Sequence, residues 1–371
     1  MSKNIPFFNY QSLFVHHKDE LTKIFQDVAS RGAFIMQDDL SDFEANLTKY
    51  TKSKFALGVA NATDAMQLLL KAGGIGPGDE VIFCSHTMVA TASAIAFTGA
   101  TPVPVDSGAD HLIDPNSIRK AINSNTKAIL PTQLNGRIAR MDEILEIASE
   151  NNLQVYEDSA QALGAKFKGQ SAGTFGLGGC ISFYPAKTLG CFGDGGAVIT
   201  DNEEIYNKVK LMRDHGRSEN GNVSVWGFNS RLDNLQAAIL NFFFQNYSET
   251  INRRREIANL YNSNLKNLAQ VLLPQPPDSD PDYYDVFQNY EIEAEQRDSL
   301  KEHLSYHGAG TLIQWGGKAV HEFRDLGFKQ SLPYTEKLMR KILMLPLNLD
   351  ISDDEVIYVC ECIKDFYNVQ N

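Results

Sequence analysis

The residue of this sequence best suited to react with a carbonyl compound is Lys187, which stands between a short apolar run and a group of glycines. It lies in Ser182-Phe-Tyr-Pro-Ala-Lys187-Thr-Leu-Gly190, and Gly193, Gly195 and Gly196 follow closely. Glycines allow a backbone to turn tightly and to approach another group. Desolvation lowers the pKa of an amine and makes it nucleophilic near neutral pH. The segment favours a lysine that bonds covalently to a carbonyl group, with a solvated loop lysine as the alternative.

Two adjacent carboxylates end an apolar run that precedes this segment. Glu157 and Asp158 follow Leu153-Gln-Val-Tyr, and Gln161 comes one turn later. A carboxylate that faces the nitrogen of a pyridine ring keeps that nitrogen protonated and the ring able to accept electrons. Asp158 is the candidate for this role, and capping of a helix by Asp158 or Ser159 is the alternative.

The third feature is the start of a helix that could bind phosphate. Residues 60–66 read Ala-Asn-Ala-Thr-Asp-Ala-Met, in which small and capping residues follow an apolar run. The free N–H groups and the dipole at such a helix terminus attract anions. We expect the backbone at Ala62 and Thr63 to bind a phosphate group, although a capped helix also occurs without any ligand.

These side chains need elements that bring them together, and the sequence around them alternates between strands and helices. This alternation indicates an α/β fold with a mostly parallel sheet, in which ligands bind beyond the carboxyl ends of the strands. Strands are predicted at 55–60, 80–84, 101–105, 127–132, 153–157 and 180–183, and helices at 63–72, 89–97, 115–122 and 141–150.

The rest of the chain reads as a smaller α+β domain. A long helical region is predicted over 232–265, and prolines between 274 and 281 then interrupt the chain. We therefore divide the chain into a large domain, 1–250, and a small domain, 251–371. Within the small domain, strands are expected at 286–292 and 311–315 and helices at 293–306 and 353–367.

Composition and charge exclude several classes of protein. The formal net charge of -12 argues against a nucleic-acid surface, which needs clustered Lys and Arg. No apolar stretch is long enough to span a bilayer, and residues 1–10 do not read as a signal peptide. The five cysteines are then expected to be reduced thiols in the cytoplasm. Neither the pair Cys360 and Cys362 nor the pair His303 and His307 has the further ligands of a metal site, so no metal is expected.

Together the three motifs resemble those of fold-type I pyridoxal-5'-phosphate (PLP) enzymes, and most closely those of the DegT/DnrJ/EryC1/StrS sugar aminotransferases. The resemblance covers nearly the whole chain. It implies a fold-type I transferase with PLP as cofactor and a homodimer whose active sites are shared. Its anchors are Gly76-Pro-Gly-Asp-Glu-Val81, Glu157-Asp-Ser-Ala-Gln161, residues 183–196, His215-Gly216 and Gly227-Phe-Asn-Ser-Arg231.

The resemblance also implies a role for individual residues. Lys187 would hold PLP covalently, Asp158 would pair with the ring nitrogen, and Gln161 would approach the ring hydroxyl. Residues that would bind the phosphate are Thr63 with the Ala62 backbone, Ser182 and, from the other subunit, Asn229, with Arg231 as a further candidate for the shared site.

The sequence departs from the family pattern at three places. Asn61-Ala62-Thr63 replaces the usual Ser-Gly-Thr, which preserves a backbone contact to phosphate and puts a seryl contact in doubt. Family members place an aromatic residue at Met88 to stack on the cofactor ring; here Met88 or His86 would take that place. In the small domain, residues 314–321 replace a Tyr-Pro…His stretch, with Trp315 and His321 as candidate substrate contacts or, alternatively, as core or surface residues.

The resemblance implies an aminotransferase that converts a nucleotide-linked keto-sugar to an amino sugar, with glutamate or glutamine as donor. The stretch 183–196 is more similar to members that aminate C3, so we expect a 3-keto sugar on UDP or dTDP, for a bacterial surface polysaccharide such as lipopolysaccharide O-antigen. The alternatives are a 4-keto-sugar aminotransferase, a PLP-dependent sugar dehydratase and a non-catalytic regulatory module. Lys187 disfavours the dehydratase, because in this family dehydration is associated with loss of the lysine.

Overall fold

The computed structural model, which describes residues 3–368, contains a central sheet that runs through the large domain. One half consists of parallel strands in the order β3 (Thr101–Val105), β2 (Glu80–Cys84), β4 (Thr126–Leu130) and β5 (Gln154–Val155). The other half has the order β6 (Glu157–Asp158), β9 (Gly179–Ser182), β10 (Gly196–Thr200) and β1 (Phe55–Val59), in which β10 is antiparallel to both neighbours.

The two halves form one surface because β6 continues β5 after a single residue, Tyr156. A parallel bridge between Thr132 and Asp158 links the end of β4 to β6. The Asp158 N–H also donates to the Pro131 carbonyl oxygen at 2.9 Å. The expected α/β fold with a mostly parallel sheet is confirmed.

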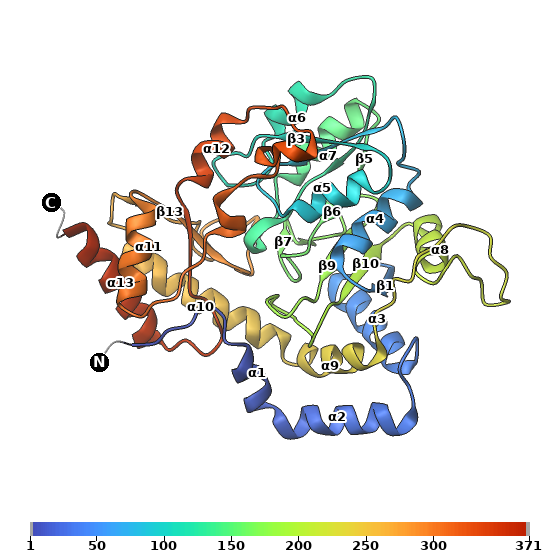
Figure 1. Ribbon diagram of the computed structural model, residues 1–371, viewed down its shortest axis with the longest axis horizontal. Coiled ribbons are helices and arrows are strands. Elements are labelled where there is room, and N and C mark those ends of the chain that lie inside the picture. The colour runs from blue at the N-terminus through green and yellow to red at the C-terminus, as the bar shows by residue number, and fades with distance from the viewer. Residues whose placement is uncertain (1–2, 369–371) are drawn as a thin grey trace.

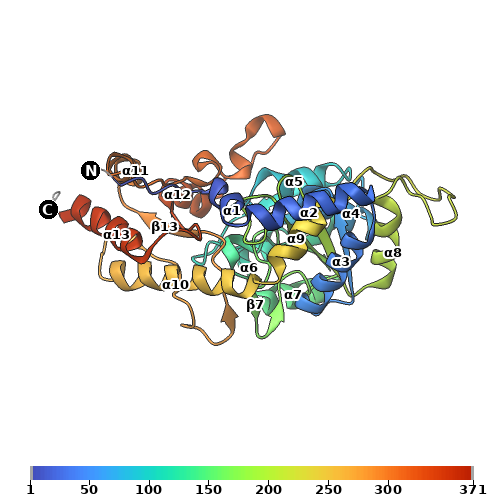
Figure 2. The ribbon, with the colours of Figure 1, turned by 90° about the horizontal axis from the view of Figure 1, so that it is seen from below.

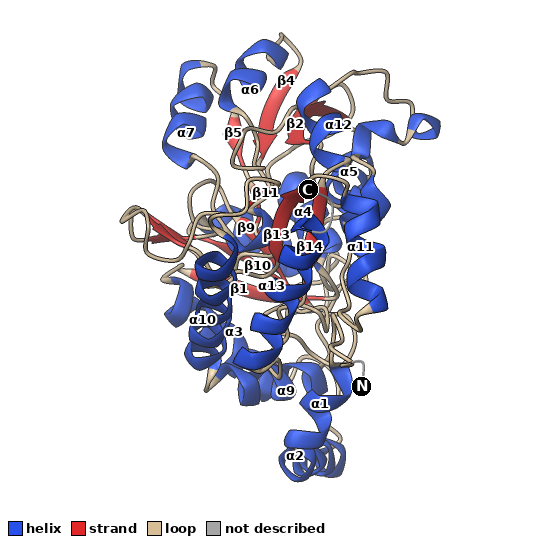
Figure 3. Ribbon diagram, turned by 90° about the vertical axis from the view of Figure 1, so that its left-hand side faces the viewer, coloured by secondary structure: helices blue, strands red, loops and turns tan. Residues whose placement is uncertain are grey.

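Helices cover both faces of this sheet and form two separate cores (Figures 1 and 3). Alternation along the strands explains the separation, since Leu57 and Val59 of β1 belong to one core and Ala56 to the other. One face is covered by α4 (Ala62–Ala72), α5 (Val89–Ala96) and α8 (Glu203–Met212). The other is covered by α3 (Asp38–Thr51), α6 (Pro115–Ala121), α7 (Met141–Glu150) and α9 (Asn234–Phe244).

The small domain is built on an antiparallel sheet. Its strand order is β11 (Val271–Leu272), β13 (Tyr290–Ala294) and β14 (Ile342–Leu345). A third core joins this sheet to α10 (Tyr247–Leu265), α11 (Arg297–Tyr306) and α13 (Asp353–Asn368), which lie together at the left of Figure 1.

The N-terminal segment crosses from one domain to the other. Ile5 is buried in the small-domain core and exchanges backbone hydrogen bonds with Gly308 and Gly310. Helices α1 (Tyr10–His16) and α2 (Lys18–Arg31) then carry the chain to the large domain, where α2 packs on α9 (Figure 2). The domain division at 250/251 stays a prediction. The N-terminal segment fits it least well, because Ile5 packs in the core of the small domain.

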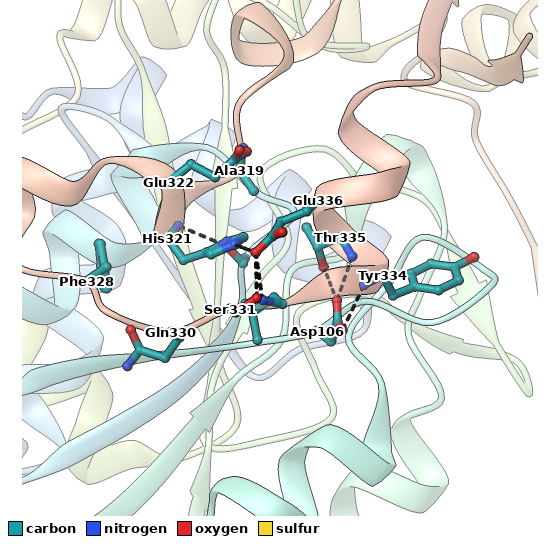
Figure 4. A network of polar contacts seen from close by, with 12 residues as sticks. Asp106, Ala319, His321, Glu322, Phe328, Gln330, Ser331, Tyr334, Thr335 and Glu336 are labelled. Atoms are coloured by element: carbon teal, nitrogen blue, oxygen red, sulfur yellow. Dashed lines mark hydrogen bonds and ion pairs between the residues drawn. The ribbon is translucent and has the colours of Figure 1, made fainter.

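A segment of the small domain also docks onto the large domain. It contains the short helices η2 (Gln314–Gly317), η3 (Val320–Glu322) and η4 (Arg324–Leu326), followed by α12 (Pro333–Met339). Asp106 at the end of β3 accepts hydrogen bonds from the backbone N–H groups of Tyr334 and Thr335, at 3.2 and 2.7 Å (Figure 4). No helix among residues 3–368 is both long and apolar enough to cross a membrane.

Candidate active site

Asp158 ends strand β6 at the carboxyl edge of the sheet, with a side chain that is only 4% exposed. Its Oδ2 accepts a hydrogen bond from Thr91 Oγ1 at 2.7 Å and lies 3.5 Å from Thr132 Oγ1. Its Oδ1 accepts from the Ala160 N–H at 3.2 Å and from the thiol of Cys180 at 3.5 Å. All these donors are neutral, so the carboxylate is buried without a cation at hydrogen-bond distance among the described residues.

Glu157, the neighbouring carboxylate, points to the opposite face of the sheet and has other partners. Gln133 Nε2 donates to its Oε2 at 2.7 Å, and the N–H groups of Gly173 and Phe175 donate at 2.9 and 2.6 Å. Burial raises the pKa of Glu157, and these hydrogen bonds act against that rise. Because the oxygens of Glu157 accept hydrogen bonds from the fold, Asp158 is the candidate of the two for a carboxylate that faces a cofactor.

Lys187 lies on the loop that follows β9, and β9 is the strand next to β6. Its own N–H donates to the Tyr184 carbonyl oxygen at 2.8 Å. The loop is clamped by Gln288 of the small domain, which donates to the Ala186 carbonyl and accepts from the Thr188 N–H, at 2.7 and 2.8 Å. Burial lowers the pKa of Lys187, while the charge of Asp158 acts in the opposite direction. A lowered pKa favours the neutral form of an amine, which is the nucleophilic one.

The start of helix α4 lies beside the end of β9. Gly196 pairs with Ser182 in the sheet, and a Cβ atom at Gly196 would lie only 2.7 Å from the Ala62 nitrogen. Only glycine therefore allows β10 to pass so close to the helix start. The side chain of Asn61 caps the helix by accepting from the Asp64 N–H at 2.8 Å. The start of α4 and Ser182 thus both lie beside Gly196, and the free N–H groups at a helix start suit a phosphate.

The side-chain oxygen of Gln161 is hydrogen-bonded within the protein. Its Oε1 accepts hydrogen bonds from the Asn135 N–H at 2.9 Å and from Asn289 Nδ2 at 3.4 Å. Within residues 3–368 its Nε2 has no partner, and this donor is the group that a ring hydroxyl would need.

Three further predicted residues, Met88, Asn229 and Arg231, are exposed or partly exposed. Met88 directly precedes α5 and is 54% exposed, so its thioether is free to cover a ring. Asn229 is exposed, and its backbone pairs with Asp214. Arg231 contacts the side chain of the same residue, since its Nη1 donates to Asp214 Oδ1 at 2.8 Å.

The structure does not bring His86 and His321 to an open surface. His86 is fully buried, its Nδ1 lies 3.0 Å from the His111 carbonyl oxygen, and its ring contacts Trp315 edge-on at 5.5 Å. His321 is fully buried between Ser85 Oγ at 2.7 Å and Glu336 Oε1 at 3.2 Å (Figure 4). Both ring nitrogens of His321 are used to dock the small-domain segment, which leaves no atom for a substrate. Trp315 alone of the three is partly exposed.

The residues that are present fit PLP. Among residues 3–368 no cation lies at hydrogen-bond distance from the buried carboxylate of Asp158, and a protonated pyridine nitrogen would supply one. The helix start at Ala62 and Thr63 offers N–H groups to a phosphate, and Gly196 leaves room for the backbone there. Lys187 supplies an amine whose pKa is lowered by burial. These three groups match the carbonyl, ring nitrogen and phosphate of that cofactor.

A cavity of about 290 Å³ adjoins the other side of the lysine loop. Its walls include Lys187–Gly190, Tyr10 and Phe8 of the N-terminal segment, Phe242 of α9 and Arg254 of α10. Asp158, Ser182 and the start of α4 do not line it. We therefore place the cofactor site by these three groups and not by the cavity.

The sequence interpretation missed the residues that support the site from behind. Thr87, Thr91 and Thr132 surround Asp158 with hydroxyl groups, and Gln288 holds the lysine loop. Thr87 and Thr91 are four residues apart at the start of a helix, a spacing that places them on one face and that could have drawn attention to them. Nothing local to Gln288 marks it, because its partners are about 100 residues away.

Comparison with known proteins gives consistent matches over almost the full length. The model of the DegT/DnrJ/EryC1/StrS aminotransferase family matches residues 16–364. A "Pleiotropic regulatory protein" of Geobacillus stearothermophilus is 37% identical, covering 98% of this chain and 99% of its own. A "dTDP-3-amino-3,4,6-trideoxy-alpha-D-glucose transaminase" of Streptomyces venezuelae is 35% identical, covering 98% and 96%. The crystal structure of S. venezuelae DesV in complex with a ketimine intermediate superposes with a TM-score of 0.93, at 36% identity and 98% coverage of both chains.

Proposed function

The chain belongs to the DegT/DnrJ/EryC1/StrS family and is a PLP-dependent sugar aminotransferase, and on this basis we propose that it aminates C3 of a UDP- or dTDP-linked keto-sugar. The proposed amino donor is glutamate or glutamine. The observation that supports this proposal most strongly is that Asp158 ends β6 and Lys187 lies on the loop after the neighbouring strand β9, so that a buried carboxylate and an amine with a lowered pKa lie at one edge of the sheet.

The chain's own residues divide the chemistry between them. When bound, PLP supplies a carbonyl that condenses with amines and a ring that withdraws electrons. Lys187 Nζ provides the amine and can take up and return a proton at the reacting carbon. Asp158 holds negative charge against the ring nitrogen, and the start of α4 with Ser182 binds the phosphate. Met88, which is 54% exposed, is the residue that would cover the ring.

The preference for C3 has two supports. The loop 183–196 carries Leu189-Gly190 after the lysine, and the structure buries both beside Lys187. Gly190 cannot be enlarged, because a Cβ atom there would lie 2.9 Å from the Pro185 carbonyl oxygen. The second support is the S. venezuelae relative, whose name specifies a 3-amino sugar on dTDP.

The proposed assembly is a homodimer in which Asn229 of one subunit reaches the phosphate site of the other. Asn229 is exposed in the single chain, and Trp226, three residues earlier, is 97% exposed. Figures 1 and 2 show the loop between α8 and α9 projecting from the body. A large aromatic side chain in such a position is typical of a surface that a partner covers. The proposed setting is the cytoplasm, in the synthesis of a surface polysaccharide such as O-antigen.

A regulatory module without catalysis is the second candidate, and the name of the Geobacillus stearothermophilus relative is the observation in its favour. A module of this kind has no need of a lysine with a lowered pKa beside a buried carboxylate, and this chain has both. Catalysis and regulation are separated by whether the purified protein turns over a keto-sugar.

Matched 3-keto and 4-keto sugars on UDP and dTDP decide the substrate. We expect the PLP-loaded protein with glutamate or glutamine to give a 3-amino sugar, located by NMR, and Lys187→Ala to give none. Amination at C4 alone would contradict the positional proposal and leave the aminotransferase in place. Failure with every ketone, in a protein that has bound PLP, would favour the regulatory module.

A further inference from the structure

We propose that Thr91, with Thr87 and Thr132 behind it, forms a directed chain of hydroxyl groups that keeps the negative charge on Asp158 and the proton on the cofactor's ring nitrogen. The proposal rests on the proposed function, since it assigns the ring nitrogen to Asp158. It makes Thr91 a positioning residue, because Thr91 acts on the cofactor only through Asp158.

The four groups form an unbroken line of short contacts. Thr132 Oγ1 lies 3.0 Å from Thr87 Oγ1, and Thr87 Oγ1 lies 2.9 Å from Thr91 Oγ1. Thr91 Oγ1 lies 2.7 Å from Asp158 Oδ2, which is the shortest contact of the series. The three threonines come from different places, namely the loop before α5, the first turn of α5 and the end of β4.

Counting hydrogens fixes the direction of the chain. A threonine hydroxyl has one hydrogen to donate, and an ionised carboxylate can only accept. Thr91 spends its hydrogen on Asp158, so in the contact between Thr87 and Thr91 it is Thr87 that donates. Thr87 has then no hydrogen left, and Thr132 must donate to Thr87. The 3.5 Å separation between Thr132 and Asp158 is the longer of the two alternatives open to Thr132.

The surroundings make this chain effective. Thr91 is 0% exposed, Thr87 1%, and Thr132 and Asp158 are each 4% exposed, so water does not screen the hydroxyl dipoles. In such a low-dielectric setting, aligned hydrogen bonds polarise one another. The other charged group that faces Asp158 is Lys187, and the thiol of Cys180 adds a weak donor, since burial raises the pKa of Cys180 well above its usual value.

The chain therefore decides where a shared proton rests. A carboxylate that receives strong hydrogen bonds holds its negative charge more readily and attracts a further proton less. A proton between Asp158 and a ring nitrogen then stays on the nitrogen, where it makes the ring an electron acceptor. Removing the Thr91 hydroxyl should shift that proton toward Asp158.

The test uses the full chain loaded with PLP that carries ¹⁵N in the ring, whose NMR frequency separates protonated from neutral nitrogen. In the wild-type protein we expect the protonated position. Thr91→Val, which keeps the shape and removes the hydroxyl, should move the resonance toward the neutral position, and Thr91→Ser should restore it. Thr87→Val and Thr132→Val should give smaller shifts, in that order.

Thr98→Val is the matched control. Thr98 is a buried threonine just beyond the same helix, and its hydroxyl donates to the Ile95 carbonyl oxygen at 2.7 Å, away from Asp158. The variant should lose stability and leave the resonance unchanged. An unchanged resonance in Thr91→Val would overturn the proposal, as would an equal shift in Thr98→Val. Turnover by the wild type is measured separately, so a failed substrate assignment cannot be mistaken for a failed hydroxyl chain.

Discussion

At Glu157 and Asp158 the chain alternates between the two faces of the sheet, as any strand does. Glu157 meets Gln133 and two backbone N–H groups on one face, and Asp158 meets Thr91 and the charge of Lys187 on the other. Two adjacent carboxylates thereby have different surroundings: Glu157 is hydrogen-bonded within the fold, and Asp158 is the one proposed to face the cofactor. The sequence identifies both carboxylates as candidates, and only the direction of each side chain in the structure distinguishes them.

Substituting each carboxylate by its amide should separate these roles. Asp158→Asn should fold normally and lose about 4 kcal/mol of transition-state stabilisation, which is about a thousandfold in rate, because no charge then faces the ring nitrogen. Glu157→Gln should keep most of its activity per folded molecule. It should lose roughly 2 kcal/mol of stability, because an amide N–H₂ would confront the Gly173 or Phe175 N–H.

Turnover and urea unfolding, measured on both variants, provide the comparison. The assignment is contradicted if Asp158→Asn turns over like the wild type, or if Glu157→Gln unfolds like the wild type and is inactive.

At the scale of the elements, a group of buried and half-buried histidine and glutamate side chains joins the two domains. His111, on the loop after β3, contacts Glu291 Oε1 at 2.9 Å and Glu293 Oε1 at 3.2 Å, both on β13 of the small domain. His86 Nε2 lies 3.7 Å from Glu291 Oε2. Burial alone would lower the pKa of His111, but the two glutamates outweigh burial and raise it to about 9. Burial alone would raise the pKa of Glu291, but His86 and His111 outweigh burial and lower this pKa to about 2.

These shifts predict how stability depends on pH. The pKa of His111 is raised from 6.5 to about 9, so its contribution is complete below pH 6.5 and is lost as the pH rises through about 9. Between these limits the free energy of unfolding should fall by on the order of 2 kcal/mol from this group. The contribution of Glu291 runs the other way, being present above pH 4.5 and lost as the pH falls toward 2.

Urea unfolding at constant protein concentration, at pH 6.5 and pH 9, measures the effect. His111→Gln should be less stable than the wild type at pH 6.5 and should lose most of the difference between the two pH values. The matched control is His16→Gln, since the His16 side chain is 63% exposed and its contact with Asp350, at 3.5 Å, is open to solvent. If the free energy of unfolding of His111→Gln falls between pH 6.5 and pH 9 as much as that of the wild type, groups other than His111 cause the fall.

The strands and helices of the large domain could be predicted from the sequence where local patterns decide them. Residues 80–84, 101–105 and 141–150 form β2, β3 and α7 as predicted, because each has a clear apolar pattern and a turn at both ends. Residues 232–265 form two helices, α9 and α10, since the chain breaks after Phe244. The predicted strand at 311–315 was wrong: Trp315 has φ 47 and lies in η2, whose conformation depends on docking to the large domain.

The site was predictable to the same extent. Lys187, Asp158 and the start of α4 could be proposed from the sequence because a strand end, a glycine cluster and a capping residue are local features. His321 was named as a substrate contact, and the structure instead buries it against Ser85, 236 residues earlier in the chain. The threonines around Asp158 and the clamp by Gln288 also depend on contacts between distant segments, which no window of sequence contains.

At the scale of the whole molecule, the single chain leaves part of its apolar surface uncovered. Trp226 is 97% exposed, Phe34 is 55% exposed and Met88 is 54% exposed. Asn229, which is predicted to bind a phosphate, is also exposed, and its backbone pairs with Asp214. The proposed dimer would account for these exposed side chains if a second copy covers them and its site receives Asn229.

Mixing two inactive variants tests this arrangement. Lys187→Ala and Asn229→Ala, expressed separately, should each be impaired, and mixed dimers should regain activity because one of their two sites carries neither defect. Random exchange would then return about a quarter of the wild-type activity. Mixed dimers that are shown to form by mass and remain inactive would contradict a role for Asn229 in the partner's site.

Covalent trapping at Lys187 tests the central claim most directly. The protein is loaded with PLP, reduced with borohydride, digested and mapped by mass spectrometry. The account predicts one modified peptide, the one that contains Lys187 from the loop after β9, and loss of the modification in Lys187→Ala. Modification of a different lysine as the main product, or an equal yield in Lys187→Ala, would contradict it.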